Sequence, residues 1–360
     1  MADEKLRVGI VGANVTNGWA PRAHLPAILA LPEFELAAVC TSQPETAAAS
    51  QEKFGAHMAF HNYQDMVNHP KIDIVSVVLK VPFHHEMTMA ALHAGKHVYT
   101  EWPLGANVTQ AEEMADLARE KGVHTMVGLQ RQCSPLYLYI KELITDGYIG
   151  DVLSCHISQM SSGSTTRVTN RVWMRDADQG GNTLTIPFGH MIDAISMCLG
   201  EMTDVSAVVS TQMTQWKEVG TDHMFDVNAP DNVMISGHLK NGAVLSAHVG
   251  AQPFHGSGQR VEIYGRYGTL VIDGNDERLL GAKGDERELK ELPIPEHLTW
   301  VPDNVPQGAP FNVAQMYRRF GEAIRSGNKT VPDFDTAVLR HKLLETIQTA
   351  SNEKTSLSLP

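Results

Sequence analysis

The stretch that decides the fold lies close to the amino terminus and reads Leu6-Arg-Val-Gly-Ile-Val-Gly-Ala-Asn-Val-Thr-Asn-Gly-Trp19. Its first part, Leu6–Val11, is short, apolar and rich in β-branched residues, which predicts a strand, and a helix is expected from the following residues to Leu31. Gly12 permits the tight turn between the two. The pattern is not GxGxxG, because Asn14 stands at the second glycine position. Asn tolerates left-handed geometry, so Asn14 can imitate the glycine. Alone, the pattern fits an ordinary strand-to-helix turn equally well.

Outward from this turn, residues up to about 130 alternate strand and helix patterns. Further strands are expected at Glu35–Cys40, Ile74–Leu79, His97–Thr100 and His124–Gly128. Helices are expected at Thr46–Phe54 and Thr109–Lys121, each opened by a capping box that starts at Ser42 or Thr109. Such alternation is typical of a parallel sheet. We therefore predict an α/β Rossmann domain, a doubly wound parallel sheet that binds a dinucleotide, over residues 1–130.

The remaining residues, 131–360, have a different pattern. A helix at Leu136–Asp146 is followed by strands, a charged Pro-rich loop at Asp276–Pro310, and final helices at Phe311–Ser326 and Asp335–Ser351. The strands are expected at Val152–Gln159, Val205–Thr211, Val233–Lys240, Val244–Gly250, Arg260–Tyr264 and Thr269–Asp273. This order predicts an α+β domain with a large, mostly antiparallel open sheet. A substrate-binding and oligomerisation role is expected for it.

Composition limits the classes of function. The chain has 360 residues, 42% of them hydrophobic, and a formal net charge of −12, which disfavours binding to nucleic acid. No apolar segment is long enough to span a bilayer, and the acidic start does not resemble a signal peptide. The four cysteines form no CxxC pair, so neither a disulfide framework nor a metal site is expected. These features predict a soluble, cytoplasmic protein that binds neither nucleic acid nor membranes.

The expected cofactor is a pyridine dinucleotide, with its pyrophosphate at the start of the helix after the glycine turn. The second strand ends at Thr41-Ser42, without the acidic residue that would bind both ribose hydroxyls of NAD. Thr41 and Ser42 could donate hydrogen bonds to a 2′-phosphate, although no Arg or Lys follows closely. The cofactor is therefore NAD or NADP, with a slight preference for NADP.

Several motifs resemble those of the glucose–fructose oxidoreductase/inositol dehydrogenase/MocA family. The residues are Ala94-Gly-Lys-His-Val-Tyr-Thr-Glu-Trp-Pro-Leu104, Val127-Gly-Leu-Gln-Arg131, Gly147-Tyr-Ile-Gly150, and Gly180-Gly181 with His190-Met-Ile-Asp193. Asn14, Gly18-Trp19-Ala20, His24-Leu-Pro-Ala-Ile28 and Phe188-Gly-His190 are closest to its subgroup of fungal galactose-pathway repressors. The resemblance implies a bound NAD or NADP and hydride transfer at a sugar or cyclitol carbon. The residues expected at the cofactor are Gly12, Asn14, Gly18, Trp19, Thr41, Ser42, Leu79, Lys80, His84, Glu101, Trp102 and Gln130.

Two catalytic groups that the resemblance implies are missing. Glu101 of the family's Glu-Lys-Pro motif is present, but Trp102 replaces its Lys; His190 is present, but Ile186 replaces the Asp four residues earlier. Trp102 either fills the space of the lysine or stacks on the nicotinamide or a ring substrate. Lys80, expected at the end of the central strand, could replace the lost lysine as a proton relay. It could equally be a solvated lysine or the partner of a carboxylate.

His190 is the second expected catalytic residue, close to the start of a helix on which Asp193 could orient its ring. A packed or capping histidine is the alternative. Expected substrate-binding residues are Trp102, Arg131, Tyr137, Trp173 and Asp193, near Arg171 and Arg175. Salt bridges on the surface would explain these arginines equally well.

Two functions are consistent with these residues. The first is an NAD(P)-dependent oxidoreductase that transfers a hydride to or from a cyclic hydroxyl or carbonyl compound, a sugar or sugar derivative, in one variant with oxidation-assisted cleavage of a glycosidic bond. The alternative is a catalytically silent NAD(P)-binding sensor that acts through protein partners. In either case, a homodimer or homotetramer through the sheet of the second domain is expected.

Overall fold

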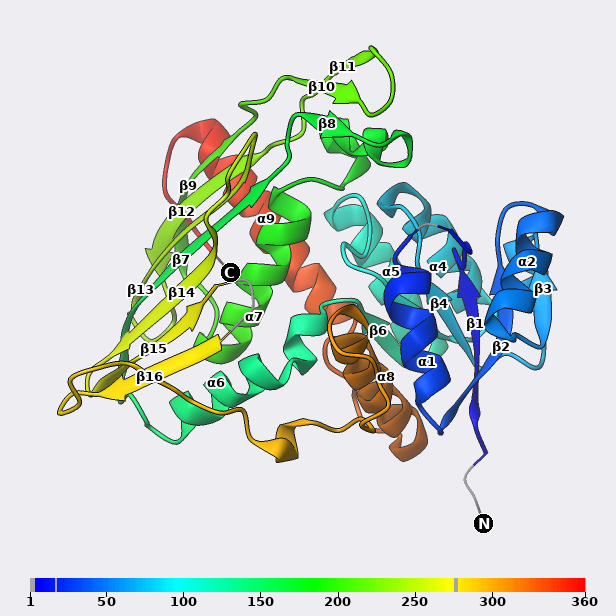
Figure 1. Cartoon of the computed structure of the whole chain (residues 1–360), viewed down its shortest axis with the longest axis horizontal. Coiled ribbons are helices and arrows are strands. Elements are labelled where there is room, and N and C mark those ends of the chain that lie inside the picture. Colours follow the sequence, from blue (N-terminus) through cyan, green and yellow to red (C-terminus); the bar gives the residue numbers. More distant parts are fainter. Residues whose placement is uncertain (1–3, 17, 275–277, 360) are drawn as a thin grey trace. The chain divides into compact units, whose positions relative to one another are not determined.

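The computed structural model describes residues 4–16, 18–274 and 278–359. Figure 1 shows the chain with its labelled elements. The described residues form two compact units, the first from Met1–Cys133 with Thr299–His341, the second from Ser134–Leu298 with Lys342–Pro360. The first boundary is close to the predicted one at residue 130. Residues 299–341, which the sequence analysis assigns to the second domain, pack with the first unit instead.

A six-stranded parallel sheet organises the first unit, in the order β3-β2-β1-β4-β5-β6. Its strands are β1 (Leu6–Val11), β2 (Phe34–Cys40), β3 (Met58–Phe60), β4 (Ile74–Val77), β5 (His97–Thr100) and β6 (Thr125–Val127). The chain leaves β1 toward β2 on one side and returns to β4 on the other, so the order reverses between β1 and β4. This arrangement confirms the predicted doubly wound Rossmann sheet. Strand β3 was not predicted, and β4 ends two residues earlier than expected.

The helices of this unit follow the strands, but their starts differ from the predictions. They are α1 (Leu25–Ala30), which continues a π-helical turn at Ala20–His24, then α2 (Pro44–Phe54), α3 (Tyr63–Val67), α4 (His84–His93) and α5 (Val108–Lys121). Both predicted capping boxes are wrong. Helix α2 starts after Gln43, which has no side-chain cap, and Asn107 caps α5 by accepting a hydrogen bond from the Gln110 N–H. Pro44, the first residue of α2, and Asn107, which caps α5, determine where these two helices begin.

Helix α8 (Ala309–Ser326) explains why the late segment joins the first unit. Its residues Val313, Tyr317 and Phe320 are completely buried in one hydrophobic cluster with Ile10 and Phe34 of the sheet strands. Because the apolar face of α8 is an integral part of this core, the Rossmann unit needs a segment that lies far from it in the sequence.

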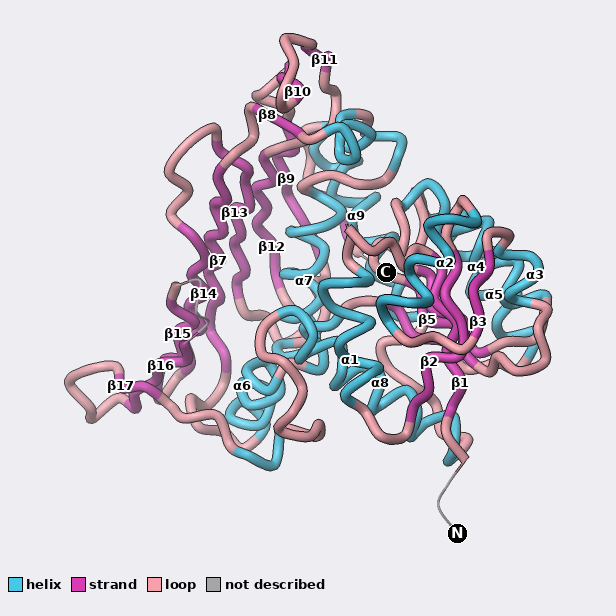
Figure 2. The backbone as a smooth tube through the Cα atoms, turned by 45° about the vertical axis from the view of Figure 1, so that its right-hand side comes forward, coloured by secondary structure: helices cyan, strands magenta, loops and turns pink. Residues whose placement is uncertain are grey.

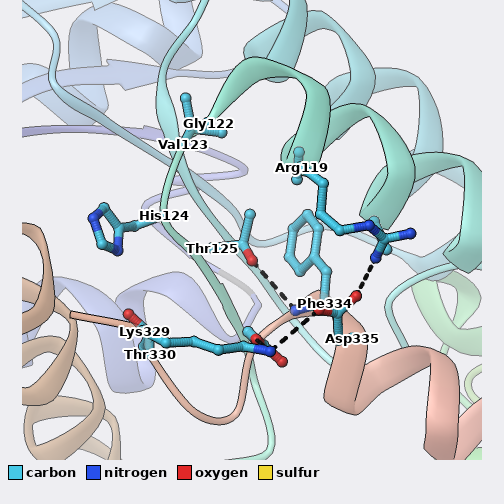
Figure 3. A pocket seen from close by; sticks show the side chains of 12 residues that line it. Arg119, Gly122, Val123, His124, Thr125, Lys329, Thr330, Phe334 and Asp335 are labelled. Carbon is cyan, nitrogen blue, oxygen red and sulfur yellow. Dashed lines mark hydrogen bonds and ion pairs between the residues drawn. The ribbon is translucent and has the colours of Figure 1, made fainter. Parts of the chain in front are cut away.

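The loop before α9 (Phe334–Glu353) is also fixed to the first unit, around a hollow shown in Figure 3. Arg119 of α5 is ion-paired with Asp335, and the Nζ atom of Lys329 lies 3.3 Å from Asp335 as well. The Phe334 N–H donates to the Thr125 hydroxyl at 3.3 Å. Both cations already have a carboxylate partner. The ion pair of Arg119 and the hydrogen bond join the segment at residues 329–335 to the rest of the first unit.

The second unit contains a nine-stranded sheet in the order β17-β16-β15-β14-β7-β13-β12-β9-β18. Only β7 and β13 pair in parallel, so the prediction of a mostly antiparallel sheet is confirmed. The strands are β7 (Val152–Ser162), β9 (Asp204–Ser210), β12 (Asn232–His238), β13 (Val244–Gln252), β14 (Gly258–Gly265), β15 (Gly268–Asp273), β16 (Arg278–Lys283), β17 (Lys290–Glu291) and β18 (Leu357–Ser358). Strands β16 and β17 correct the loop predicted at 276–310, of which residues 276 and 277 lie outside the described residues. They extend the sheet because β16 pairs with β15.

Helices α6 (Pro135–Thr145) and α7 (Gly189–Leu199) lie on one face of this sheet (Figures 1 and 2). Burial alternates along β12, where Val233 and Ile235 are buried and Met234 between them is 49% exposed. The face opposite the helices therefore carries exposed apolar side chains.

A small sheet that the sequence did not predict lies beside the large one. It contains β8 (Thr166–Arg167), β10 (Gln215–Glu218) and β11 (Met224–Asp226), in the order β11-β10-β8. A 3₁₀ segment at Thr169–Arg175 follows β8 (Figure 1).

Candidate functional site

Gly12 brings the glycine turn into contact with the loop after β4, at the point where the strand order reverses. Its φ is +97°, and a Cβ atom at this position would lie 2.1 Å from the carbonyl oxygen of Val78. No other residue can occupy this space without moving the backbone. Ligands of doubly wound sheets bind at this place, outside the carboxyl ends of the strands.

Asn14 does not replace the second glycine in the predicted way. Among the described non-glycine residues only His255 and Lys354 have positive φ, so the expectation of left-handed geometry at Asn14 is wrong. Its side chain shapes the turn instead, because Oδ1 accepts hydrogen bonds from the Thr16 N–H at 2.9 Å and the Thr16 hydroxyl at 2.8 Å. This Asx-type turn bends the loop at residue 14 without a glycine at that position.

Helix α2 holds the same loop from the other side. The Ser50 hydroxyl donates to the carbonyl of Ala13, and the Lys53 ammonium donates to the carbonyl of Val15 at 2.7 Å. The N–H groups of Gly12, Asn14 and Thr16 also donate within the protein, to Cys40, Gly12 and Asn14. These bonds hold the loop in a fixed conformation.

Trp19 and Gly18 complete the turn. Gly18 has a φ of +114°, and the nearest atom to an added Cβ would be 4.0 Å away. Trp19 precedes the π-helical turn, and its indole Nε1 is buried with no hydrogen-bond partner in the described structure. An unpaired buried donor is unusual and is satisfied most simply by a ligand or water.

The loop after β2 differs from the prediction. The Thr41 hydroxyl lies 3.2 Å from the carbonyl oxygen of Gln43 and 2.7 Å from the Thr46 hydroxyl, so it helps to fold the start of α2. Ser42 is exposed. Of the two residues expected at a 2′-phosphate, Ser42 is therefore the one whose hydroxyl is not committed to α2.

The loop after β4 carries Leu79, Lys80 and His84. Lys80 is exposed and lies three residues beyond the end of β4, so the expectation that it ends the central strand is wrong. His84 is buried, with Nδ1 2.7 Å from the Pro103 carbonyl and Nε2 3.1 Å from the Leu79 carbonyl. Burial lowers the pKa of His84 despite these two bonds. It connects the loops after β4 and β5 rather than presenting its ring to a ligand.

Glu101 belongs to a chain of polar side chains that the sequence analysis missed. Its Oε1 lies 2.8 Å from His24 Nε2, His24 Nδ1 lies 2.8 Å from the Tyr317 hydroxyl, and that hydroxyl lies 2.8 Å from the Ser76 hydroxyl. His24, Ser76 and Tyr317 are fully buried, and burial strongly raises the pKa of Tyr317. The network fixes Glu101 from the core side. Tyr317 could not be found by pattern, because it comes from α8.

Trp102 is 4% exposed, and its ring packs against His341 of α9 with centroids 4.8 Å apart. This packing favours the first of its two predicted roles, a large aromatic side chain that fills the space of the family's lysine. His341 is also buried, and its Nε2 has no hydrogen-bond partner among the described residues. Burial lowers the pKa of His341 to about 4.

The buried His341 predicts a loss of stability in mild acid. Its pKa is about 4 when folded, against the ordinary value of 6.5, so the unfolded chain binds the extra proton first. Its contribution is complete above pH 6.5 and falls by about 3 kcal/mol as the pH drops to 4. In urea unfolding at pH 7.5 and 5.0, His341→Leu is expected to lose less stability than the unmodified protein. Equal losses in both proteins would contradict this assignment.

Gln130 lies three residues beyond β6, in a short 3₁₀ turn with Arg131. The side-chain Oε1 of Gln130 is buried and has no hydrogen-bond partner in the described structure. Together, the space that only glycine can occupy at residue 12 and the unpaired polar atoms of Trp19 and Gln130 fit a dinucleotide along the carboxyl edge of the sheet. The predicted cofactor residues lie in the segments that directly follow β1, β2, β4, β5 and β6, with His84 at the first position of α4 and Gln130 in a 3₁₀ turn.

In the second unit, His190 is the second residue of α7, after a π-helical turn at Leu184–Phe188. Asp193 lies one turn further along α7 and is 1% exposed. Tyr137 is completely buried, with its hydroxyl 4.0 Å from Met191 Sδ, so the expectation that it contacts a substrate is wrong for this structure.

The aromatic and basic residues near residue 173 have separate environments. Trp173 packs against Gly181, where an added Cβ would lie 2.4 Å from its ring. The Arg175 guanidinium donates to the Asp226 carbonyl at 3.2 Å. Neither residue is left free to rotate toward a ligand without a cost in packing.

Among the described residues, no group of three His, Cys, Asp or Glu side chains could hold a metal ion. The four cysteines are buried and unbridged, and burial raises the pKa of Cys40 to about 12. No helix in the described part of the chain is long and apolar enough to cross a membrane.

Each of the two units contains a segment that matches the model of a known protein family. Residues 6–129 match the model of an oxidoreductase family with an NAD-binding Rossmann fold, and residues 135–274 match that of the Gal80p C-terminal domain. The first part of the chain is therefore similar to this family of oxidoreductases, also known as the glucose–fructose oxidoreductase/inositol dehydrogenase/MocA family. The second part is similar to the C-terminal domain of Gal80p.

Individual proteins that match the chain share a modest sequence identity with it. Dehydrogenase aclE from Aspergillus oryzae is 33% identical over 58% of this chain and 58% of its own length. The galactose/lactose metabolism regulatory protein GAL80 of Saccharomyces cerevisiae is 29% identical over 75% of this chain and 67% of its own length. The match thus spans less than two thirds of aclE. A structure of levoglucosan dehydrogenase with NADH and L-sorbose has the same fold, with a TM-score of 0.86 at 23% identity over 99% of each chain.

Proposed function

We propose that this protein is an NAD(P)-dependent oxidoreductase that acts on a cyclic hydroxyl or carbonyl compound, a sugar or sugar derivative. The observation that carries the proposal is the turn at Gly12, where a side chain would collide with the Val78 carbonyl. Relatives named as dehydrogenases support the same class. When bound, the nicotinamide supplies or accepts a hydride. Oxidation-assisted cleavage of a glycosidic bond is a variant of this chemistry.

The protein's own residues would have separate tasks. The turn from Gly12 to Trp19 binds the pyrophosphate, and Gln130 offers an unpaired side-chain carbonyl in the 3₁₀ turn after β6. We propose His190 as the group that exchanges a proton with the substrate oxygen, oriented by Asp193, and Lys80 as a second proton-transfer residue. Ser42, at the end of a strand without an acidic residue, admits either NAD or NADP and slightly favours NADP.

A catalytically silent NAD(P)-binding sensor is the second candidate function. The position of the family's lysine holds Trp102, buried against His341, and Ile186 stands where the family has Asp. GAL80, one of the relatives, is named as a regulatory protein. In this alternative the dinucleotide would change the affinity for a protein partner rather than react.

A titration followed by an activity panel separates the two functions. We expect the purified protein to bind NADH or NADPH, measured by quenching of its tryptophan fluorescence. With NAD+ or NADP+ and a panel of sugars, cyclitols and glycosides, an oxidoreductase would produce absorbance of the reduced cofactor. Tight binding with no turnover across the panel would favour the sensor. Absence of binding to either coenzyme would contradict both functions.

We propose in addition that the protein is a homodimer or homotetramer through the exposed face of the large sheet. Val208 and Met234 lie opposite each other on β9 and β12 and are 57% and 49% exposed. Met234→Glu is expected to reduce the molar mass in light scattering to that of a monomer, whereas Leu29→Glu, at an exposed apolar residue of α1, should not. An unchanged mass for the first variant would rule out this face. A cytoplasmic location and the lack of nucleic-acid or membrane partners stay predictions.

A further inference from the structure

A cavity of about 500 Å³ lies entirely within the second unit. It is enclosed by β8, β10, the 3₁₀ segment at Thr169–Arg175 and the residues that lead into α7. This volume is typical of small-molecule sites. Ile186, one of its lining residues, is four positions before His190 in a continuous helical run. A molecule held in the cavity therefore contacts the segment that carries the proposed acid–base group.

Two arginines give the cavity a positive charge. Arg167 is fixed, because its Nη1 donates to the carbonyls of Gly163 at 2.6 Å and Thr166 at 2.8 Å, and its guanidinium lies 4.2 Å from the centre of the Trp216 ring. Arg171 is exposed, and its guanidinium has no hydrogen bond or ion pair within the described structure. Burial, and then the charge of Arg171, lower the pKa of Arg167. The two cations thus lie close enough to repel each other, which an anion between them would relieve.

The only carboxylate among the described lining residues is already occupied. Asp231 is 6% exposed and accepts hydrogen bonds from the Gln212 N–H at 2.9 Å, the Met213 N–H at 2.7 Å and the Asn232 side-chain amide at 2.9 Å. Its charge is used to fix the loop before β10. The cavity retains an excess of positive charge in a protein whose formal net charge is −12.

A buried hydroxyl and an aromatic ring complete the lining. Ser164 is 1% exposed, and its Oγ has no hydrogen-bond partner among the described atoms. Trp216 and Met174 supply an apolar wall. Such a combination of a fixed cation, an unpaired hydroxyl and an indole ring suits a hydroxylated ring with apolar faces and one anionic substituent.

We propose that this cavity binds the anionic group of an acidic sugar, a carboxylate or a phosphate on a hydroxylated ring, and thereby selects the substrate. The proposal rests on the proposed oxidoreductase function and names its substrate class. Arg171 is the specificity residue: its unpaired guanidinium pairs with the anionic group, while Arg167 holds the cavity open against Trp216.

The test is calorimetry of the full protein, saturated with NADH, against glucuronate, glucose 6-phosphate and glucose. We expect one of the two anionic sugars to bind at least tenfold more tightly than glucose, and whichever does identifies the substituent. Arg171→Gln should remove this preference without changing the affinity for glucose. Arg175→Gln is the matched control, because this arginine is in the same segment but donates to the Asp226 carbonyl and does not line the cavity.

The outcomes separate this inference from the proposed function. If glucose binds as tightly as both acids, or if Arg171→Gln and Arg175→Gln reduce the preference equally, the inference is wrong, even where neutral sugars are oxidised. If an acidic sugar binds with the expected dependence on Arg171 but is never oxidised or reduced, the cavity stands and the oxidoreductase function falls. Affinity for the acid should also fall with rising salt, since the pair is partly exposed.

Discussion

Replacing Gly12 with alanine is expected to lower the affinity for NADH by about 100-fold or more, which corresponds to roughly 3 kcal/mol of lost binding free energy. The reason is geometric: the new Cβ would lie 2.1 Å from the Val78 carbonyl and 2.9 Å from a Leu79 methyl, so the turn proposed to hold the pyrophosphate must open. Affinity is measured by fluorescence titration, with circular dichroism to monitor folding.

Gly55→Ala is the matched control for this experiment. Gly55 also has positive φ in the first unit, but an added Cβ would meet nothing within 4 Å. It should therefore cost some stability from backbone strain and leave NADH binding unchanged. If both variants bind NADH as the unmodified protein does, the glycine turn is not the dinucleotide site.

His190→Asn is expected to lower kcat by roughly 100-fold or more while leaving NADH affinity intact, because a general acid–base residue contributes about 10²- to 10⁴-fold. Asparagine keeps hydrogen bonding but cannot exchange a proton near neutral pH. The measurement needs a substrate from the activity panel, steady-state kinetics and a separate cofactor titration. His238→Asn, on an exposed strand residue paired with Asp204, should behave as the unmodified protein.

Lys80→Met, made in parallel, assigns the second proton-transfer position. A loss of kcat comparable to that of His190→Asn would establish Lys80 as the replacement for the missing lysine of the family, despite its exposure. Normal turnover in Lys80→Met would remove it from the mechanism, and normal turnover in His190→Asn would do the same for the imidazole.

Much of the fold could be predicted because several strands are recognisable from their local sequence alone. Leu6–Val11 and the apolar Ile74–Val77 are recognisable as buried strands in any context, and the order of elements then determines a parallel sheet. The short strands β8, β10 and β11 could not be predicted, because they depend on pairing with distant segments rather than on their own composition.

In the candidate site, the sequence predicts correctly only a residue whose role depends on its backbone conformation. Gly12 is identifiable from its place between strand and helix. The roles of His24 and His341 depend on Tyr317 and Trp102, which lie far away in the sequence, and no local pattern reports such contacts. Lys80 was misplaced for a related reason: apolar residues continue to Leu79, but pairing stops at Val77.

Helix α8 has a consequence for how the protein is made. The first 133 residues contain every strand of the parallel sheet but not Tyr317 or Phe320, which fill its core. During synthesis, the core of these 133 residues therefore stays incomplete, with apolar surface exposed, until the last fifty or so residues begin to emerge from the ribosome. Truncation after the sixth strand would yield an aggregation-prone fragment rather than an independent coenzyme-binding module, and biosynthesis of this chain leaves chaperones a long interval in which to act.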